Sequence, residues 1–200
     1  MGKENGRIVE GKEKNAQDTL IQVASLLFQR QGYHATGVNQ IIKESKIPKG
    51  SLYYYFPGGK EEIAMEAVKR NAAFVSERIQ DSLQQIQDPA LAIEHLINSL
   101  GEQFLSAEST MGVPIASVAL ETALISDSLR AACTAAYEAF EVLFSEKLRQ
   151  SGYQEELAKE LGIVINSMME GAFIVSLTKG NLDPLYAVSR QIKILLGKKI

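Results

Sequence analysis

The stretch that decides the fold is residues 36–62, which read TGVNQIIKESKIPKGSLYYYFPGGKEE. Thr36 can cap a short helix, and Pro48 suits the first turn of the next helix, where its missing N–H costs nothing. Pro57 and the two glycines after it end that second helix. With an amphipathic helix predicted over 16–31, these segments make three short helices joined by tight turns, the pattern of a helix-turn-helix unit.

The rest of the chain predicts helices and no strand. Its apolar residues recur at helical spacing, and the Asp-Pro pairs that begin at Asp88 and Asp183 each indicate a helix start. The expected fold is therefore all-α, with about nine helices. Besides the three short ones, the predicted helices cover about 60–88, 89–104, 115–124, 129–150, 155–177 and 183–196.

Charge is distributed unevenly along the chain. The net charge of −3 combines +4 in residues 1–60, which carry nine Lys/Arg and five Asp/Glu, with −7 in residues 61–200. A basic segment is attracted to phosphates, while an acidic remainder keeps the body of a protein soluble. No segment has the roughly 18 consecutive apolar residues of a membrane span, so we expect a cytoplasmic protein without a membrane partner.

The chain lacks the residue groupings that enzymes and metal sites require. Its only histidines, His34 and His95, lie in separate helical contexts, and no Gly-x-Ser-x-Gly run or metal-ligand cluster occurs. The Gly-Gly run before Lys60 is no phosphate loop, because Glu61 follows it in place of Ser or Thr. A lone Cys133 cannot form an internal disulfide. We therefore expect no catalytic residue, no metal and no cofactor.

The helix predicted over 49–56 carries groups that suit a DNA groove. A recognition helix enters the major groove, which is about 12 Å wide, and offers donors to bases and phosphates. Leu52 and Phe56 should face the core, whereas three consecutive tyrosines point about 100° apart, so at least one must be exposed. The candidate DNA contacts, including a helix cap before this helix and a lysine after it, are Thr36, Lys49, Gly50, Ser51, Tyr53, Tyr54, Tyr55 and Lys60.

Residues 16–65 resemble the TetR family of repressors. The resemblance rests on a Gly-Tyr turn at 32–33, the Lys-Gly-Ser-Leu-Tyr run at 49–53 and the exit from Phe-Pro to Lys-Glu-Glu at 56–62. Further along, the run ETALIS at 121–126 resembles the LmrA/YxaF-type branch of that family. The resemblance implies a regulator of transcription that binds a DNA operator, and no enzyme.

The resemblance also implies which residues contact bases and which contact phosphates. The positions of Lys49 and Gly50 read bases in the family, and those of Tyr53, Tyr54 and Lys60 hold phosphates. The cap residue of the preceding helix meets a phosphate through its backbone amide. Base and phosphate contacts would then come from one exposed helix face and from the helix ends beside it.

Two features depart from the family pattern. Lys46 stands where the family commonly has Gly, so the turn must accept a side chain, with some backbone strain. The exit from Pro57 to Lys60 is one residue longer than the commonest pattern, which bears on where Lys60 can reach. Tyr55 also occupies a position that is often histidine.

Composition and the resemblance together predict how the chain is divided. Residues 1–14 mix Gly, Lys and Glu with little apolar content, so they are expected to form a flexible basic arm. By resemblance, residues 15–60 are the helix-turn-helix DNA-binding domain, and 61–200 an effector-binding and dimerisation domain. A small hydrophobic effector would enter the C-terminal bundle, shift the long helix from Lys60 and release a palindromic operator. Efflux or detoxification genes are the targets that the family implies.

Bulky or soft apolar side chains in the C-terminal part are candidates for the effector site, because methionine and aromatic residues adapt to varied apolar ligands. The polar Glu121 and Asn166 could orient a ligand, or lie at the surface. For each apolar residue, ordinary core packing stays an open alternative. Few charges among the candidates favour a neutral or weakly polar, aromatic effector. The full set is Phe104, Met111, Glu121, Tyr137, Phe140, Phe144, Asn166, Met168, Met169 and Phe173.

The helix predicted over 155–177 has apolar residues on more than one face, together with small residues that allow close helix approach. Such a helix requires burial on two sides. With the last helix it is expected to form a four-helix homodimer interface around a two-fold axis. A helical dimeric small-molecule carrier or interaction module without DNA binding is the alternative to a regulator.

Overall fold

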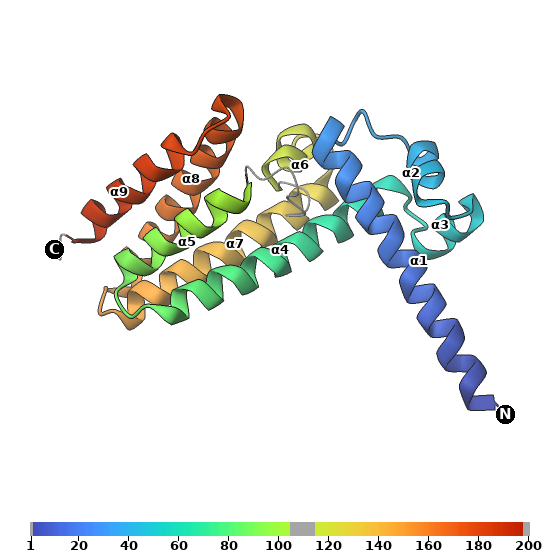
Figure 1. Ribbon diagram of the computed structural model, residues 1–200, viewed down its shortest axis with the longest axis horizontal. Coiled ribbons are helices and arrows are strands. Elements are labelled where there is room, and N and C mark those ends of the chain that lie inside the picture. Colours follow the sequence, from blue (N-terminus) through green and yellow to red (C-terminus); the bar gives the residue numbers. More distant parts are fainter. Residues whose placement is uncertain (1, 105–114, 198–200) are drawn as a thin grey trace. The chain divides into compact units, whose positions relative to one another are not determined.

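The structure is a computed structural model that describes the backbone of residues 2–104 and 115–197 and the side chains of 16–101 and 115–197. All regular elements in these ranges are helices, and there are nine of them, so the predicted all-α fold is confirmed (Figure 1). They are α1 (Gly2–Gln31), α2 (Val38–Ser45), α3 (Lys49–Tyr55), α4 (Lys60–Gln85), α5 (Pro89–Phe104), α6 (Ile115–Thr122), α7 (Asp127–Gln150), α8 (Glu155–Lys179) and α9 (Asp183–Gly197).

The chain divides into two compact units. Unit 1 is Met1–Asn71 with Gly112–Cys133, and unit 2 is Ala72–Met111 with Thr134–Ile200. By packing, unit 1 therefore includes the start of α4 and all of α6, beyond the functional boundary at residue 60 that the sequence predicts. The assignment of tasks to residues 15–60 and 61–200 stays a prediction, because packing alone does not define a task.

In unit 1, helices α1, α2 and α3 pack against one another. The face of α1 that carries Leu20, Leu27 and Phe28 is buried at the spacing of an amphipathic helix. Leu52 of α3 is fully buried and Phe56 is 2% exposed, which confirms the expectation that these two side chains face the core. Burial of one face of α3 fixes which of its residues point away from the core.

Helix α1 begins at Gly2, so residues 2–14 are helical where the sequence predicts a loose arm. No proline interrupts this segment, and half of its residues are Lys, Arg or Glu, which have high helix propensity. Extending an existing helix costs less free energy than nucleating one, so residues 16–31 favour the continuation of the same helix through residues 2–14. Its three glycines disfavour a helix by themselves.

Thr36 does not cap α2, which corrects the prediction from the sequence. Gly37 is the N-cap residue and makes no side-chain cap hydrogen bond. Thr36 is fully buried, and its hydroxyl donates to the carbonyl oxygen of Gly32 over 2.7 Å. The turn after α2 does accept a side chain as expected, since Lys46 adopts the left-handed conformation with φ 58°. That conformation costs roughly 1–2 kcal/mol for a residue other than glycine.

The helix start at Asp88 agrees with the sequence prediction, and Ser126 caps α7 in the same way. The Leu91 N–H donates to Asp88 Oδ1 over 2.9 Å, and the Leu129 N–H donates to Ser126 Oγ over 3.1 Å. Each bond satisfies a backbone donor in the first turn of a helix that would otherwise lack a partner. Local capping chemistry therefore sets where α5 and α7 begin.

In unit 2, α9 packs against both α5 and α8. The Tyr153 hydroxyl donates to the Leu196 carbonyl over 2.6 Å, and Lys193 Nζ lies 3.0 Å from Glu94 Oε2. These contacts tie the C-terminal part of α9 to α5 and to the turn before α8. Gly162 brings α8 close to α7, since a Cβ atom on it would lie only 2.7 Å from the Glu141 carbonyl oxygen.

Candidate nucleic-acid interface

Helix α3 presents its polar side away from the core of unit 1. Lys49 and Gly50 are exposed, and Tyr54 is 72% and Tyr53 42% exposed. Ser51 and Tyr55 are half-buried. The expectation that three consecutive tyrosines cannot all be buried is confirmed, because Leu52 occupies the inward side of the helix.

The glycine in α3 is not required by packing within the unit. A Cβ atom built on Gly50 would have no heavy atom within 4 Å, and glycine lowers the stability of a helix interior relative to alanine. Glycine is also favoured where another molecule approaches the backbone closely. A glycine at an exposed position beside Lys49 therefore fits an intermolecular contact.

Exposed lysines lie on both helices of the motif and in the turn between them. Lys43 of α2, Lys46 of the turn and Lys49 of α3 are all exposed, whereas Glu44 is the one carboxylate among residues 38–55. The motif therefore has a basic surface. Such a surface attracts phosphates whatever their base sequence.

The exit from α3 is held by its own hydrogen bonds. The Gly58 N–H donates to Glu62 Oε2 over 2.8 Å, and Gly59 adopts φ 64°, a conformation that favours glycine. Lys60 follows as the first residue of α4. The additional residue of the exit is thus accommodated by a glycine turn that a carboxylate of α4 closes.

Lys60 makes an internal contact in unit 1. Its Nζ donates to the Tyr33 carbonyl oxygen over 3.0 Å and lies 4.1 Å from the centre of the Tyr33 ring. Desolvation by burial lowers the pKa of Lys60, and the nearby negative charge of Glu121 opposes this change. An ammonium group has three donors, so one hydrogen bond to a carbonyl leaves two. The phosphate contact predicted for Lys60 stays a prediction.

Glu121, a predicted effector contact, also binds within unit 1. Its carboxylate accepts the N–H of Tyr33 over 3.1 Å and the N–H of His34 over 2.8 Å. The sequence analysis missed this role because the partners lie 88 and 87 residues away along the chain. The Gly-Tyr turn that carries the family resemblance is the only sequence signal that marks them.

The effector candidates of unit 2 differ in burial. Phe140, Phe144, Asn166 and Met169 are buried, and Tyr137, Met168 and Phe173 are half-buried. The rings of Tyr137 and Phe140 meet edge to face, with their centres 6.5 Å apart. Such burial fits a core as well as a ligand site, so these residues stay predictions. Of the two remaining candidates, Met111 lies outside the described residues, and Phe104 ends α5 with its side chain outside the described ones.

Glu170 is a titratable group of α8 that the sequence analysis passed over. Burial raises its pKa to about 7, and no charged group contributes to this change. Nothing in the sequence around Glu170 indicates that its carboxyl group is buried, because burial depends on helices distant along the chain. Its position one turn from Asn166 and Phe173 places it on the same side of α8 as two of the effector candidates.

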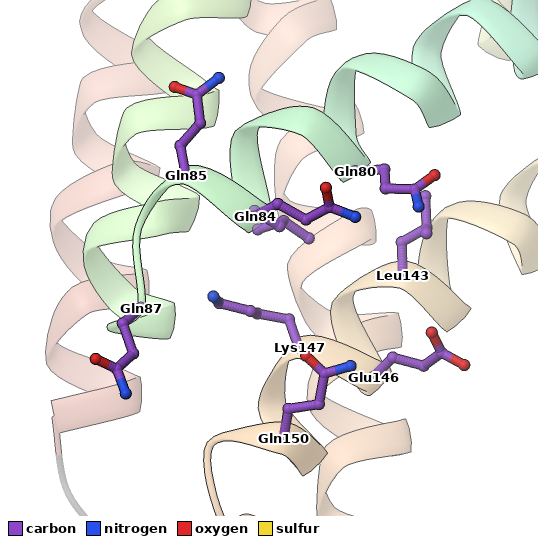
Figure 2. A pocket seen from close by; sticks show the side chains of 9 residues that line it. Gln80, Gln84, Gln85, Gln87, Leu143, Glu146, Lys147 and Gln150 are labelled. Carbon is purple, nitrogen blue, oxygen red and sulfur yellow. The ribbon is translucent and has the colours of Figure 1, made fainter.

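A groove of unit 2 lies at the end of α4 and beside α7. Its volume is about 530 Å³, and Figure 2 shows amide side chains and Lys147 around it. Lys147 Nζ donates to the Ile86 carbonyl over 2.6 Å, so its charged group is bound to the backbone just after the C-terminal end of α4. None of the effector candidates lines this groove. Its lining consists of Gln80, Leu83, Gln84, Gln85, Gln87, Leu143, Glu146, Lys147 and Gln150.

The described residues include no group of three or more His, Cys, Asp and Glu side chains that could hold a metal ion. Cys133 is buried in α7, and desolvation raises the pKa of its thiol. A raised pKa disfavours the thiolate, which is the reactive and metal-binding form. The cysteine therefore behaves as a small apolar side chain.

The exposed basic helix-turn-helix and the all-helical body define a class of protein, the helix-turn-helix regulators of transcription. Residues 20–67 match the family model "Bacterial regulatory proteins, tetR family", and residues 89–191 match "Transcriptional regulator LmrA/YxaF-like, C-terminal domain". The chain belongs to the TetR family of transcriptional regulators, in its LmrA/YxaF-like branch. Both levels of the resemblance seen in the sequence are thereby confirmed, as is the expectation of a protein that is not an enzyme.

Two similar proteins from Bacillus subtilis match nearly the whole chain. The uncharacterized HTH-type transcriptional regulator YxaF is 46% identical over 185 residues, which are 92% of this chain and 97% of that protein. The HTH-type transcriptional regulator LmrA is 44% identical over 184 residues, 92% of this chain and 98% of that protein. Both are regulators of transcription by name.

Solved structures share the fold at lower identity. The reduced form of E. coli NemR has a TM-score of 0.78 at 20% identity and covers 90% of this chain and 97% of its own. A TetR regulator from Chloroflexus aurantiacus has a TM-score of 0.79 at 20% identity, with 94% and 96% of the two chains covered. At this identity the likeness concerns the fold alone.

Proposed function

We propose that this regulator binds a palindromic operator through α3 and acts as a repressor. The observation that carries the proposal is the division of α3 into a buried side at Leu52 and an exposed side with Lys49, Gly50 and Tyr54. An exposed lysine can donate to guanine O6 and N7, and tyrosine hydroxyls can reach phosphates. Ser51, Tyr53 and Tyr55 complete the contact face.

The regulator acts as a homodimer, in this proposal, because one recognition helix reads only one half-site. Two helices reading successive major grooves must lie about 34 Å apart, or at multiples of that distance. Exposed apolar side chains on α8 and α9 support a dimer through these helices, since water solvates them poorly. They are Ile163, Val164, Ile174, Val175, Leu177, Tyr186, Ile194 and Leu195.

The composition of α8 fits the same interface. By length and hydropathy this helix is apolar enough to cross a membrane, and 33% of its most apolar window is buried within the chain. A partner copy would bury part of the remainder, as two-fold dimers of all-helical proteins commonly do. In this proposal α8 is apolar on two sides because one side packs within its own chain and the other against the partner copy in a cytoplasmic dimer.

The proposed effector is a small hydrophobic, aromatic compound that enters unit 2 and releases the operator. The concentration of Tyr137, Phe140, Phe144 and Met169 on α7 and α8 supports this proposal. By family resemblance, the regulated genes serve efflux or detoxification. The relatives' names state only that they regulate transcription, so the effector and the genes rest on resemblance and chemistry.

A salt series tests the DNA-binding proposal. Fluorescence anisotropy measures the affinity for the gene's own upstream DNA and for random duplex, with Lys49→Ala, Tyr54→Ala and, as control, Lys69→Ala, an exposed lysine of α4. We expect preference for the upstream DNA, an affinity that falls steeply with salt, and losses of about tenfold or more in the two α3 variants alone. Equal affinity for both duplexes would favour the carrier or interaction module instead.

A further inference from the structure

In the turn between α1 and α2, both the backbone N–H and the backbone carbonyl of Tyr33 are hydrogen-bonded to charged side chains. The Tyr33 N–H donates to Glu121 Oε1 over 3.1 Å, and the Tyr33 carbonyl accepts from Lys60 Nζ over 3.0 Å. The His34 N–H donates to the other carboxylate oxygen, Oε2, over 2.8 Å. A carboxylate and an ammonium group thus bind the same peptide segment, each at the backbone groups that its charge favours.

These two charged side chains come from helices outside the helix-turn-helix motif. Lys60 is the first residue of α4, and Glu121 lies at the C-terminal end of α6. Neither side chain is fully exposed, and the bonds that Glu121 and Lys60 make to the Tyr33 backbone are partly shielded from water. The turn before α2 is therefore bonded directly to the N-terminal end of α4 and the C-terminal end of α6, both within unit 1.

Further contacts restrict the same region. His34 Nε2 lies 3.1 Å from the Glu121 carbonyl oxygen, and the Lys60 ammonium sits over the Tyr33 ring. A Cβ atom on Gly32 would lie 2.3 Å from Glu121 Oε1, so the glycine leaves the space that the carboxylate occupies. Gly32 also has φ 85°, which favours glycine. Both the turn conformation and the space that the Glu121 carboxylate occupies therefore require glycine at position 32.

The ends of α4 and α6 are joined a second time beside this site. The Ser126 hydroxyl, four residues after α6 ends, donates to Glu61 Oε1 over 2.7 Å. Lys60 and Glu61, the first two residues of α4, therefore each have a partner outside their own helix. A displacement of α6 relative to α4 would have to break these bonds together.

We propose that Lys60 and Glu121 form a latch on Tyr33 and His34 that sets the position of the helix-turn-helix for DNA binding. Glu121 is then a positioning residue that supports operator affinity without touching DNA. Lys60 acts in the same way, through the turn and not at a phosphate. This inference rests on the proposed DNA-binding function, which the salt series tests by itself.

The direction in which DNA affinity changes when Glu121 is neutralised distinguishes the latch from a simple electrostatic effect. Replacing a carboxylate by a neutral side chain in a basic DNA-binding unit removes a repulsion from phosphates and should tighten DNA binding slightly. A broken latch should weaken it. Asp127→Asn is the matched control, because the Asp127 side chain is 90% exposed and forms an ion pair with Arg130 in the same helix turn, away from Tyr33 and His34.

The experiment combines hydrogen exchange with DNA affinity in the full-length protein. Glu121→Ala is expected to raise the amide exchange rates of Tyr33 and His34 about tenfold or more, and to weaken operator binding by about tenfold or more, at an unchanged salt slope. Glu121→Gln keeps the shape and one acceptor, so it should give smaller changes of the same sign. Asp127→Asn should leave the amide exchange rates of Tyr33 and His34 at the wild-type level. Its operator affinity should be equal to the wild-type affinity or slightly higher.

Three outcomes would overturn the latch. They are unchanged exchange at Tyr33 and His34 in both Glu121 variants, unchanged operator affinity in both, or a Lys60→Ala variant whose salt slope falls by about 0.9, the value for one lost phosphate contact. Thermal unfolding confirms that each variant is folded before binding is measured. If the wild-type protein shows no DNA preference, the proposed function fails by that result, whereas exchange still reports on the latch bonds.

Discussion

The hydroxyl of Thr36 donates to the carbonyl oxygen of Gly32 over 2.7 Å. Thr36 is fully buried, so this bond closes the turn from inside unit 1 and restricts the five residues between α1 and the N-cap of α2. A partly buried carbonyl that loses its donor keeps part of the cost of leaving water. This bond therefore contributes to the stability of the motif before any DNA is bound.

Thr36→Val should lower the free energy of unfolding by about 1–3 kcal/mol, because it keeps the shape of the side chain and removes the donor. Urea unfolding followed by circular dichroism measures the change. Thr36→Ser keeps the hydroxyl and is the control, with a smaller loss from the missing methyl group. A valine variant as stable as the serine variant would show that the hydroxyl contributes nothing.

Exchanging two glycines of α8 for alanine should have opposite effects. Gly162→Ala places a Cβ atom 2.7 Å from the Glu141 carbonyl oxygen and should destabilise the protein by about 1–3 kcal/mol. Gly171→Ala meets no heavy atom within 4 Å and should stabilise the helix by about 0.5–1 kcal/mol. Thermal unfolding at one protein concentration compares them, and equal shifts would contradict the close approach of α8 to α7.

Glu170 should make stability depend on pH. Its folded-state pKa of about 7 exceeds the ordinary value of 4.5, so the folded protein binds this proton more tightly than the unfolded chain. The stabilisation is fully present below about pH 4.5, declines as pH rises toward 7 and is lost above it. Glu170→Gln imitates the protonated form and should remove this decline.

The measurement for Glu170 is urea unfolding of both proteins across that range. The two should be about equally stable at the acid end, and at about pH 8 the glutamine variant should be more stable by up to about 3 kcal/mol. Glu138→Gln, an exposed carboxylate of α7, is the control and should follow the wild-type curve. Parallel curves for wild-type and Glu170→Gln would mean that the Glu170 carboxyl is not desolvated in the folded protein.

A charge on the exposed apolar face of α8 should separate the proposed dimer. Ile174 is 44% and Leu177 61% exposed, and an aspartate at either position would be buried without a partner in a helix interface. Light scattering after size-exclusion chromatography should then give the mass of one chain, 21.9 kDa. Val142→Asp, at an exposed apolar residue of α7, should leave the mass unchanged. A wild-type mass of one chain would contradict the dimer outright.

Much of the architecture could be predicted because it depends on neighbours along the chain. Apolar spacing and capping groups such as Asp88 and Ser126 place helix starts within a few residues. The loose arm was the exception, because a segment without proline that is rich in Lys, Arg and Glu can continue an adjoining helix even though its glycines and few apolar residues suggest a loop. Thr36 failed as a cap because the burial of its side chain, which the sequence does not show, directs its hydroxyl back to Gly32.

By itself the sequence determined the all-helical fold, the helix-turn-helix, its exposed tyrosines and the family, since each follows from residues close together in the chain. Only the tertiary structure decided which partners the charged side chains have. Glu121 binds an amide 88 residues away, and Lys60 binds a carbonyl 27 residues away. Periodicity shows which side of a helix is apolar, but a hydrogen bond requires two groups to meet within about 3 Å, and only packing brings such distant groups together.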